Sequence, residues 1–244
     1  MSSAAAEENK LNWPREYLAA IRSGETPACI KIKAVYEREV GWMDNPPEDF
    51  PFYFDEEAGQ RVIDFIEKFC RGSKGKWIGK PIRLELFQKA KIQLAFGWKE
   101  KETGFRRFRE VGDIRGRKCG KSTETSGVEL YMLTADGEGG ADVYCTANKK
   151  DQAAIVFNEA ANMRSQSPAL RSHTQKRQSD IYFPKTFSFL KALAADTKTM
   201  DGLNTHFFSL DEWHEARTSK VYDVMKQSQS ARTQPMAWLI STNG

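Results

Sequence analysis

The sequence contains no long apolar run, few cysteines and little excess of either charge. A membrane-spanning helix would need about 18 consecutive apolar residues, and none occur, so no membrane contact is expected. The four cysteines, Cys29, Cys70, Cys119 and Cys145, lack the paired spacing of a metal site and suit a reducing compartment. The N-terminus MSSAAAEENK does not resemble a signal peptide. Together these absences predict a globular protein of the cytoplasm.

A net charge of +4, from 37 basic and 33 acidic residues, is too small to establish a nucleic-acid partner. The basic residues are nevertheless concentrated locally, in GFRRFRE at 104–110 and in IRGRKCGK at 114–121. Such stretches either contact DNA or form a solvated basic face beside a phosphate-binding loop. Both alternatives remain open at this stage.

The N-terminal part has helical patterns and a proline-rich end. Residues 1–10 are expected to form a disordered tail, and 13–40 to form two helices that break at Ser23–Gly24. The prolines of 41–55 should prevent regular structure there. We therefore predict an N-terminal helical or lid segment over 11–55.

The remaining part, 56–244, is expected to form the core domain. It should begin with an amphipathic helix over 56–72 that has Gly72 as its C-cap. Further strands are predicted at 107–114, 141–147, 179–184, 205–212 and 236–244, with helices at 122–133, 149–165 and from about 219. Apolar strands that alternate with helices predict an α/β fold with a mostly parallel sheet, and ligands bind such sheets at the carboxyl ends of the strands.

A candidate phosphate-binding loop lies at 112–127, GDIRGRKCGKSTETSG. A strand and a turn lead to Gly120, Lys121 and Ser122 at the start of a helix, where backbone N–H groups bind anions. Lys121 would reach the β- and γ-phosphates, and Ser122 would offer a hydroxyl oxygen to Mg²⁺. The usual pattern G-x-x-x-x-G-K-[ST] lacks its first glycine here, because Arg115 stands in its place. The loop is thus a damaged motif, a chance match or a variant in which arginine has a purpose.

A second candidate element, HFFSLDEWHEA at 206–216, ends an apolar strand in Asp211 and Glu212. This is the Walker B pattern, in which the aspartate holds Mg²⁺ and the next acid polarises the attacking water as general base. Acidic pairs also begin many surface helices. The phosphate-binding loop upstream favours the catalytic interpretation, and the two elements predict an ATP and Mg²⁺ site.

Two further polar positions are consistent with nucleotide hydrolysis. In LISTNG at 239–244, a buried strand ends in Ser241, Thr242 and Asn243, where a polar residue can contact the γ-phosphate or the attacking water. Gln88, in KPIRLELFQKAKI at 80–92, has an amide that can donate to and accept from the edge of adenine. The alternatives are an ordinary polar turn for Thr242 and an ordinary helix surface for Gln88.

These four elements, in this order, resemble those of the large terminase subunits of tailed bacteriophages. The similarity covers about residues 13–244: RKCGKS resembles the arginine-bearing Walker A of that family, ADTKTMDGLNTHFFSLDEWHEA its approach to Walker B, and ISTNG its coupling motif. In the family the first Walker glycine is commonly absent, and an arginine takes the place of Arg117. The resemblance implies a P-loop NTPase of the ASCE/RecA-like class, with helices flanking the sheet and an N-terminal helical subdomain.

The resemblance also implies roles for individual residues. Glu212 would activate water, Arg117 would reach the γ-phosphate in cis, and Thr242 would couple hydrolysis to motion, while Ser122 and Asp211 would hold Mg²⁺. The implied nucleotide-binding residues are Gln88, Arg117, Lys118, Cys119, Gly120, Lys121, Ser122 and Thr123. Arg115 and Lys118 could instead be merely solvated. Cys119 is either a mildly reactive thiol near positive charge or a small filler, and His214 either couples the site to DNA or a neighbouring chain or is a packing or capping residue.

The family implies partners as well. Double-stranded DNA would be gripped through its phosphates without sequence preference, by a ring of chains assembled with the portal protein and the small terminase subunit in the host cytoplasm. A neighbouring chain could offer Arg164, Arg171, Arg177 or Lys198 in trans. Relatives continue into a nuclease domain, whereas this sequence stops at Gly244, so we expect an ATPase portion without the nuclease site.

Two other functions compete with a packaging motor. The first is a DExH helicase-like ATPase, since D-E-W-H resembles that box, although the sequence has neither a second lobe nor the glycine-rich Walker A of such helicases. The second is an assembly module that binds ATP without hydrolysing it. Glu212 argues against the second alternative, because a module without turnover needs no general base.

Overall fold

The computed structural model describes residues 11–193, 202–216 and 218–242. The predicted tail at 1–10, together with Lys198 and Asn243, lies outside these residues. Internal contacts divide the chain into two compact units, which are described separately below. The first unit contains residues 1–63 and 84–107, and the second contains 64–83 and 108–244. The domain boundary predicted at residue 55 stays a prediction. The division by internal contacts instead places residues 84–107 in the same unit as the N-terminal helices.

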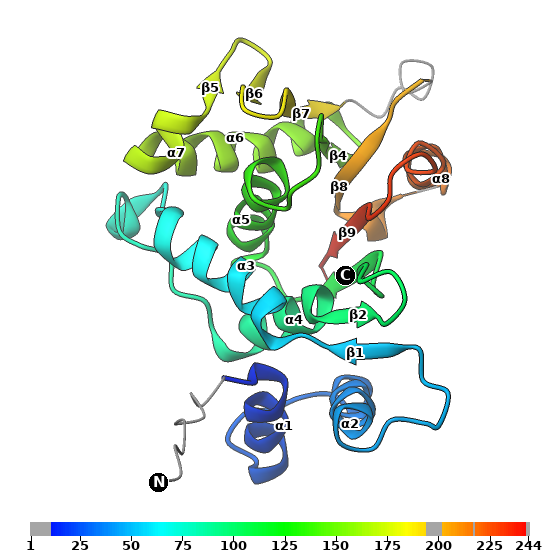
Figure 1. The fold of residues 1–244 in the computed structure, drawn as a ribbon. Helices are drawn as coiled ribbons and strands as arrows, with labels where there is room; N and C mark the ends of the chain where they lie inside the picture. Colours follow the sequence, from blue (N-terminus) through cyan, green and yellow to red (C-terminus); the bar gives the residue numbers. More distant parts are fainter. Residues whose placement is uncertain (1–10, 194–201, 217, 243–244) are drawn as a thin grey trace, which may run out of the picture. The chain divides into compact units, whose positions relative to one another are not determined.

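The first unit is mostly helical (Figure 1). Its elements are α1 Trp13–Ser23, α2 Ile30–Asp44, β1 Phe52–Phe54, the first half of α3 Glu56–Phe69, α4 Leu86–Gly97 and β2 Trp98–Glu100. The side chain of Asn12 caps α1 by accepting from the N–H of Arg15 at 3.2 Å, and α1 ends at Gly24 with φ of 82°. The predicted break at Ser23–Gly24 is confirmed.

The prediction that 41–55 lacks regular structure is wrong at both ends of the segment. Helix α2 continues to Asp44, and β1 pairs antiparallel with β2, with Phe54 opposite Trp98. The prolines allow this arrangement because Pro46 and Pro47 follow the last helical residue and Pro51 precedes the strand.

The two arginines at the centre of the basic stretch 104–110, Arg106 and Arg107, neither form a solvated face nor are free to contact DNA. Arg106 is 4% exposed. The guanidinium of Arg107 pairs with the buried Glu39 at 3.0 Å. It also lies 4.7–5.4 Å from the ring centres of Trp42, Phe50, Phe52 and Trp98. These arginines therefore belong to the core of the first unit, because aromatic faces attract a cation in the absence of water.

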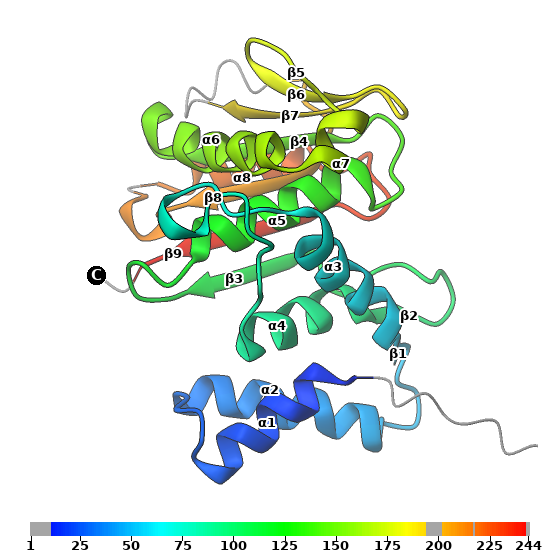
Figure 2. The same ribbon diagram turned by 90° about the vertical axis from the view of Figure 1, so that its left-hand side faces the viewer.

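The second unit is built on a seven-stranded sheet with strand order β3-β9-β8-β4-β7-β6-β5 (Figure 2). The strands are β3 Glu110–Ile114, β4 Asp142–Ala147, β5 Gln175–Lys176, β6 Asp180–Phe183, β7 Ser188–Leu193, β8 Thr205–Asp211 and β9 Met236–Ser241. The strands from β3 to β7 in this order pair in parallel. Strand β6 pairs antiparallel with β7, and β5 pairs antiparallel with β6. The mostly parallel sheet is confirmed, while the strand β7 was not predicted.

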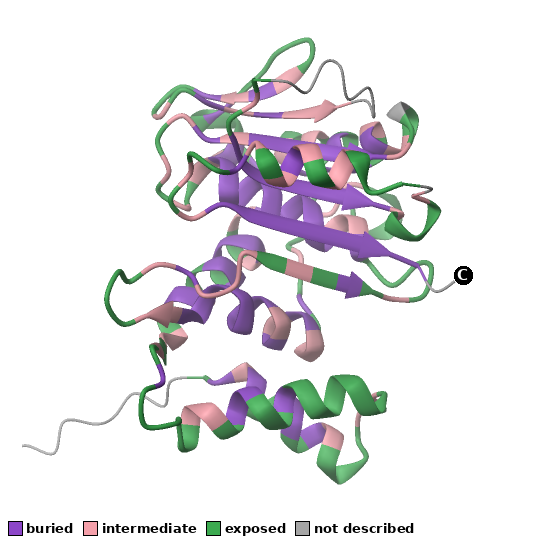
Figure 3. Ribbon diagram, turned by 90° about the vertical axis from the view of Figure 1, so that its right-hand side faces the viewer, coloured by how far each residue is buried: buried purple, intermediate pink, exposed green. Residues whose placement is uncertain are grey.

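Helices cover both faces of this sheet, as an α/β fold requires. Helices α5 Lys121–Thr134 and α6 Lys150–Gln166 lie on one face and α8 Lys220–Gln227 on the other (Figures 1 and 2). The short helix α7 Pro168–His173 follows α6. Figure 3 shows the central strands β4, β8 and β9 buried, apart from Asp142 at the start of β4, while the edge strand β3 is mostly exposed or half-buried. The core therefore lies under β4, β8 and β9, the strands that carry the candidate site.

The prediction that Gly72 caps the preceding helix is wrong. Helix α3 ends at Phe69, three residues earlier. A Cβ at Gly72 would lie 2.3 Å from the carbonyl oxygen of Trp77, so glycine is required by a close approach of backbone within the 70–83 loop.

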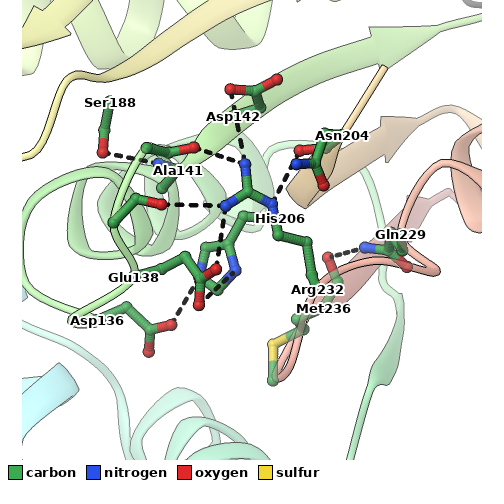
Figure 4. A network of polar contacts seen from close by, with 12 residues as sticks. Asp136, Glu138, Ala141, Asp142, Ser188, Asn204, His206, Gln229, Arg232 and Met236 are labelled. Carbon is green, nitrogen blue, oxygen red and sulfur yellow. Dashed lines mark hydrogen bonds and ion pairs between the residues drawn. The ribbon is translucent and has the colours of Figure 1, made fainter. Parts of the chain in front are cut away.

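The amino ends of the strands are joined by a mostly half-buried polar network around the buried His206 (Figure 4). Arg232 pairs with Glu138 at 3.0 Å and with Asp142 at 3.8 Å, and it also donates to backbone carbonyls. His206, near the start of β8, makes a 2.7 Å contact with Asp136. The network stabilises the edge of the sheet opposite the end of β8, where Asp211 lies.

Candidate nucleotide-binding site

The topology brings the ends of four parallel strands together. Strands β3, β9, β8 and β4 are neighbours, with Ile114 opposite Ser241 and Ala147 opposite Asp211. The loop after β3 and the polar residues after β8 and β9 therefore meet at one edge of the sheet. Ligands bind parallel α/β sheets at this edge.

The loop that joins β3 to α5 has the backbone of an anion-binding turn. Lys118 and Gly120 have φ of 60° and 74°, and Gly120 caps the N-terminus of α5. The Nζ atom of Lys121 points into the loop and donates to the carbonyls of Arg115 at 3.0 Å and Gly116 at 2.9 Å. Lys121 is only 8% exposed, so its ammonium group is held within the loop. A phosphate group bound there could replace the two carbonyls as its hydrogen-bond acceptor.

Arg115, at the position of the missing glycine, is not solvated. Its guanidinium donates to Asp113 at 2.6 Å, to Glu124 at 2.7 Å and to the carbonyl of Cys119 at 3.1 Å. Burial alone would lower the pKa of Arg115, but the charges of Glu124 and Asp113 outweigh it and raise the pKa. Arg115 therefore ties the strand, the loop and the helix together, so it fixes the loop without the first glycine.

The next loop residues face solvent. Arg117, Lys118, Cys119 and Gly120 are exposed, and within the part of the chain that the structure describes the Arg117 guanidinium has no hydrogen bond or ion pair. The Sγ atom of Cys119 lies 3.6 Å from the carbonyl of Arg117. Arg117 is thus the loop arginine that is available to a ligand, while Arg115 is occupied.

Helix α5 starts with two half-buried hydroxyl groups, those of Ser122 and Thr123. The Thr123 hydroxyl lies 3.5 Å from the carboxylate of Glu159 on α6. Ser122 has no hydrogen-bond partner among the described residues, which leaves its hydroxyl available to a metal ion.

Asp211 ends β8 and is 8% exposed. Burial raises the pKa of Asp211 to about 6; the N–H of Glu212 and the charge of Lys121 oppose this rise, whereas the charge of Glu212 adds to it. The described residues contain no group of three or more His, Cys, Asp and Glu side chains that could hold a metal. A hydroxyl and one carboxylate are nevertheless a fitting pair for Mg²⁺, which keeps several waters and takes other oxygens from the nucleotide.

Glu212 is held in a strained backbone conformation beside Asp211. Its φ is 50°, and its N–H donates to Asp211 at 2.9 Å. The Thr242 hydroxyl donates to the Glu212 carboxylate at 3.0 Å. The Nδ1 atom of His214 lies 3.3 Å from the same carboxylate and 3.0 Å from the Ser241 hydroxyl. The ends of β8 and β9 are therefore joined through the carboxylate predicted to be catalytic.

Asn148, after β4, was not predicted and joins this arrangement. Its amide donates to the carbonyl of Glu212 at 3.1 Å. This bond supports the strained turn at Glu212 from the neighbouring strand. The only sequence signal was a polar residue just beyond an apolar strand, in VYCTAN.

Gln88 belongs to the first unit, where it has a local role. Its side-chain oxygen accepts from the N–H of Glu85 at 2.8 Å, forming a capping box for α4, and the residue is 7% exposed. Gln88 is therefore a buried capping residue of α4, while its contact with adenine stays a prediction.

The residues considered for action in trans differ in their surroundings. Arg164 donates to Thr174 at 2.7 and 2.6 Å, and Arg177 forms two bonds with Asp180 at 2.7 and 2.9 Å. Arg171 donates to the carbonyl of Ser165 at 3.2 Å. Of these three arginines, Arg171 would lose the fewest hydrogen bonds if its side chain turned toward a neighbouring chain.

A buried acid behind the site was also missed. Glu129, on α5, is fully buried and accepts from the Ser209 hydroxyl of β8 at 2.6 Å. Burial raises the pKa of Glu129 to about 8; bonds to Ser209 and Cys145 oppose the rise, and the charge of Asp211 adds to it. Glu129 is therefore largely protonated at neutral pH and joins the Walker A helix to the Walker B strand.

Because the pKa of Glu129 is raised by folding, we expect the unfolding free energy to depend on pH. The pKa of Glu129 in the folded chain, about 8, lies above its ordinary value of 4.5, so its favourable contribution is complete below pH 4.5 and is lost as the pH rises through 8. Between pH 6 and 8 the wild type should lose roughly 1–3 kcal/mol more unfolding free energy than Glu129→Gln. Denaturant unfolding of both proteins at the two pH values measures this difference, and parallel losses would contradict it.

Comparison with known proteins decides the family. The profile described as "Terminase large subunit, ATPase domain" matches residues 86–244. The chain belongs to this family. This chain is 32% identical over 191 residues to the large terminase subunit of Enterobacteria phage HK97. The match covers 75% of this chain and 36% of the HK97 protein.

One solved structure agrees with this assignment. The crystal structure of the HK97 bacteriophage large terminase matches the terminase chain with a TM-score of 0.64 and 29% identity, over 75% of this chain and 37% of that one. The Thermus phage P74-26 large terminase ATPase domain matches with a TM-score of 0.47 and 21% identity, over 56% of this chain and 60% of that one. The terminase chain thus spans little more than a third of the length of its HK97 relative. The predicted family and α/β fold class are confirmed.

No helix in the described ranges is long and apolar enough to span a membrane.

Proposed function

We propose that this chain is the ATP-hydrolysing motor part of a terminase large subunit that drives double-stranded DNA into a procapsid. The observation that carries the proposal is the cluster at the strand ends. Lys121 is held inside the phosphate loop, and Glu212, whose carboxylate accepts from Thr242 at 3.0 Å, stands next to the buried Asp211. A phosphate-binding loop beside a metal-binding acid and a general base is the arrangement that phosphoryl transfer to water needs.

Each residue has a distinct part in the proposed reaction. The loop N–H groups and Lys121 bind the phosphates, and Ser122 with Asp211 would hold Mg²⁺, which neutralises charge on the phosphate oxygens. Glu212 orients the attacking water and takes its proton. Because Thr242 bonds to Glu212, a change in that carboxylate can be transmitted to the end of β9.

Arg117 should support hydrolysis more than binding. Its guanidinium is exposed on the loop and is a permanently charged planar donor for the γ-phosphate. Arg117→Ala should lower the hydrolysis rate by about 10²–10³-fold while nucleotide affinity changes little. Calorimetric titration with a non-hydrolysable ATP analogue, beside a steady-state ATPase assay, separates the two effects. Equal losses in both would make Arg117 an anchor of the nucleotide only.

The proposed partners follow from the family. They are double-stranded DNA, the portal protein, the small terminase subunit and neighbouring copies of the chain in a ring, in the cytoplasm of the host cell. A duplex-unwinding assay with the full-length protein tests the helicase alternative. ATP-dependent strand separation without packaging would favour that alternative, and packaging without unwinding would support the motor.

A further inference from the structure

The 70–83 loop of the second unit is unusually basic. The loop and the end of α3 before it, residues 68–83, contain six basic residues and no Asp or Glu. These are Lys68, Arg71, Lys74, Lys76, Lys80 and Arg83. The net charge of the whole chain is only +4, so this short segment holds more positive charge than the chain as a whole. Such a concentration fits a polyanion.

The loop presents an aromatic side chain among these charges. Trp77 is 60% exposed, and Ile78 beside it is 56% exposed. The Nζ atoms of Lys76 and Lys80 lie 5.0 and 5.7 Å from the centre of the Trp77 ring. Neither ammonium has a hydrogen bond or an ion pair within the described ranges, so both are available to an external anion.

The loop is also held in one shape. The N–H of Gly72 donates to the carbonyl of Lys80, and the N–H of Gly79 donates back to the carbonyl of Gly72, both at 2.9 Å. Trp77 lies at the turn between these bonds, in the short 3-10 helix Gly75–Trp77. A preformed loop loses little conformational entropy on binding a partner.

The base of the loop is anchored beside the nucleotide site. Ser73 donates to the buried Glu159 at 2.6 Å, and Lys74 pairs with the same carboxylate at 2.9 Å. Glu159 is also the acid that lies 3.5 Å from the Thr123 hydroxyl at the start of α5. Lys74 is thus occupied as an anchor, while Lys76 and Lys80 project from the loop.

We propose that Lys76, Trp77 and Lys80 form a docking surface for the sugar–phosphate backbone of duplex DNA. The two ammonium groups would contact phosphates, and the indole would pack on the sugars between them, which gives binding without sequence preference. The proposal rests on the proposed function for the identity of the polyanion. It adds the place on this chain where the DNA is held.

The test is the affinity of the full-length protein for a fluorescent duplex, measured by anisotropy without nucleotide over a range of salt concentrations. Lys76→Ala/Lys80→Ala should weaken binding about tenfold or more at physiological salt and reduce the log–log salt slope by about 2. Lys31→Ala/Lys33→Ala removes the same charge from two exposed lysines of α2 and should leave affinity and slope unchanged. Trp77→Ala should weaken binding a few-fold without changing the slope, since the indole carries no charge.

Three results would overturn this surface: equal affinity of the two double variants, wild-type affinity of Trp77→Ala, or tight binding of single strands or polyglutamate but not of duplex. Thermal unfolding of each variant establishes that it is folded. ATP hydrolysis is measured separately. A wild type that hydrolyses no ATP but loses duplex affinity through Lys76→Ala/Lys80→Ala would contradict the motor and leave the surface standing.

Discussion

Arg115→Ala should destabilise the second unit by roughly 3–5 kcal/mol, because it leaves two buried carboxylates without their cation. Asp113 and Glu124 are 5% and 1% exposed, and both bond to the same guanidinium. The loop would also lose the bond from Arg115 to the carbonyl of Cys119. Chemical denaturation of wild type and variant measures the loss.

The informative companion is Arg115→Gly, which restores the first glycine of the usual Walker pattern. If the arginine holds the loop as described, Arg115→Gly should be as unstable as Arg115→Ala despite its better match to the pattern. Arg117→Ala, two residues away and exposed, should change stability by less than about 0.5 kcal/mol. Adding Glu124→Gln to Arg115→Ala should recover part of the loss, since the charge of a buried carboxylate that has lost its bond to Arg115 is removed. An Arg115→Gly protein as stable as the wild type would show that the motif is simply degenerate.

Glu212→Gln should lower ATP hydrolysis by about 10²–10⁴-fold and leave ATP binding nearly intact. The amide oxygen can still accept from Thr242, so the turn and the strand ends should keep their geometry. Only the capacity to take a proton from water is removed. Steady-state turnover and analogue binding, measured on the same preparation, separate chemistry from affinity.

Glu215→Gln is the matched control for this variant. Glu215 follows in the same short turn, is exposed, and contacts Gln152 at 3.2 Å. Removing its charge should change the rate little, because its carboxylate bonds to Gln152 and its charge is the smallest of the influences on the pKa of Asp211. Similar rate losses in Glu212→Gln and Glu215→Gln would mean that the general charge of the turn matters, and that neither acid is the base.

The residues proposed to act on phosphate and metal could be placed from sequence because their position depends on local order. Lys121 follows a strand and opens a helix, and Asp211 and Glu212 end an apolar strand, so the parallel topology alone brings them together. The same reasoning located Thr242 at the end of the neighbouring strand. The structure then added the bond that joins Thr242 to Glu212.

The residues that support this site could not be predicted in the same way. The role of Arg115 depends on which acids face it after folding, and Glu124 has the same pattern as any glutamate in the first turn of a helix. Glu129 could not be singled out because nothing in the sequence reports that α5 is buried on nearly every side. Strand β7, SFLKAL, has alternating burial and few continuous apolar residues, so it lacked the signal of its buried neighbours.

The most direct test of the motor is ATP consumption by the full-length protein assembled with the portal and duplex DNA. Wild type should hydrolyse ATP while DNA enters the procapsid, and the Glu212→Gln assembly should bind ATP and DNA but stop both processes. A wild-type assembly that hydrolyses ATP no faster than the Glu212→Gln assembly would contradict the proposed function.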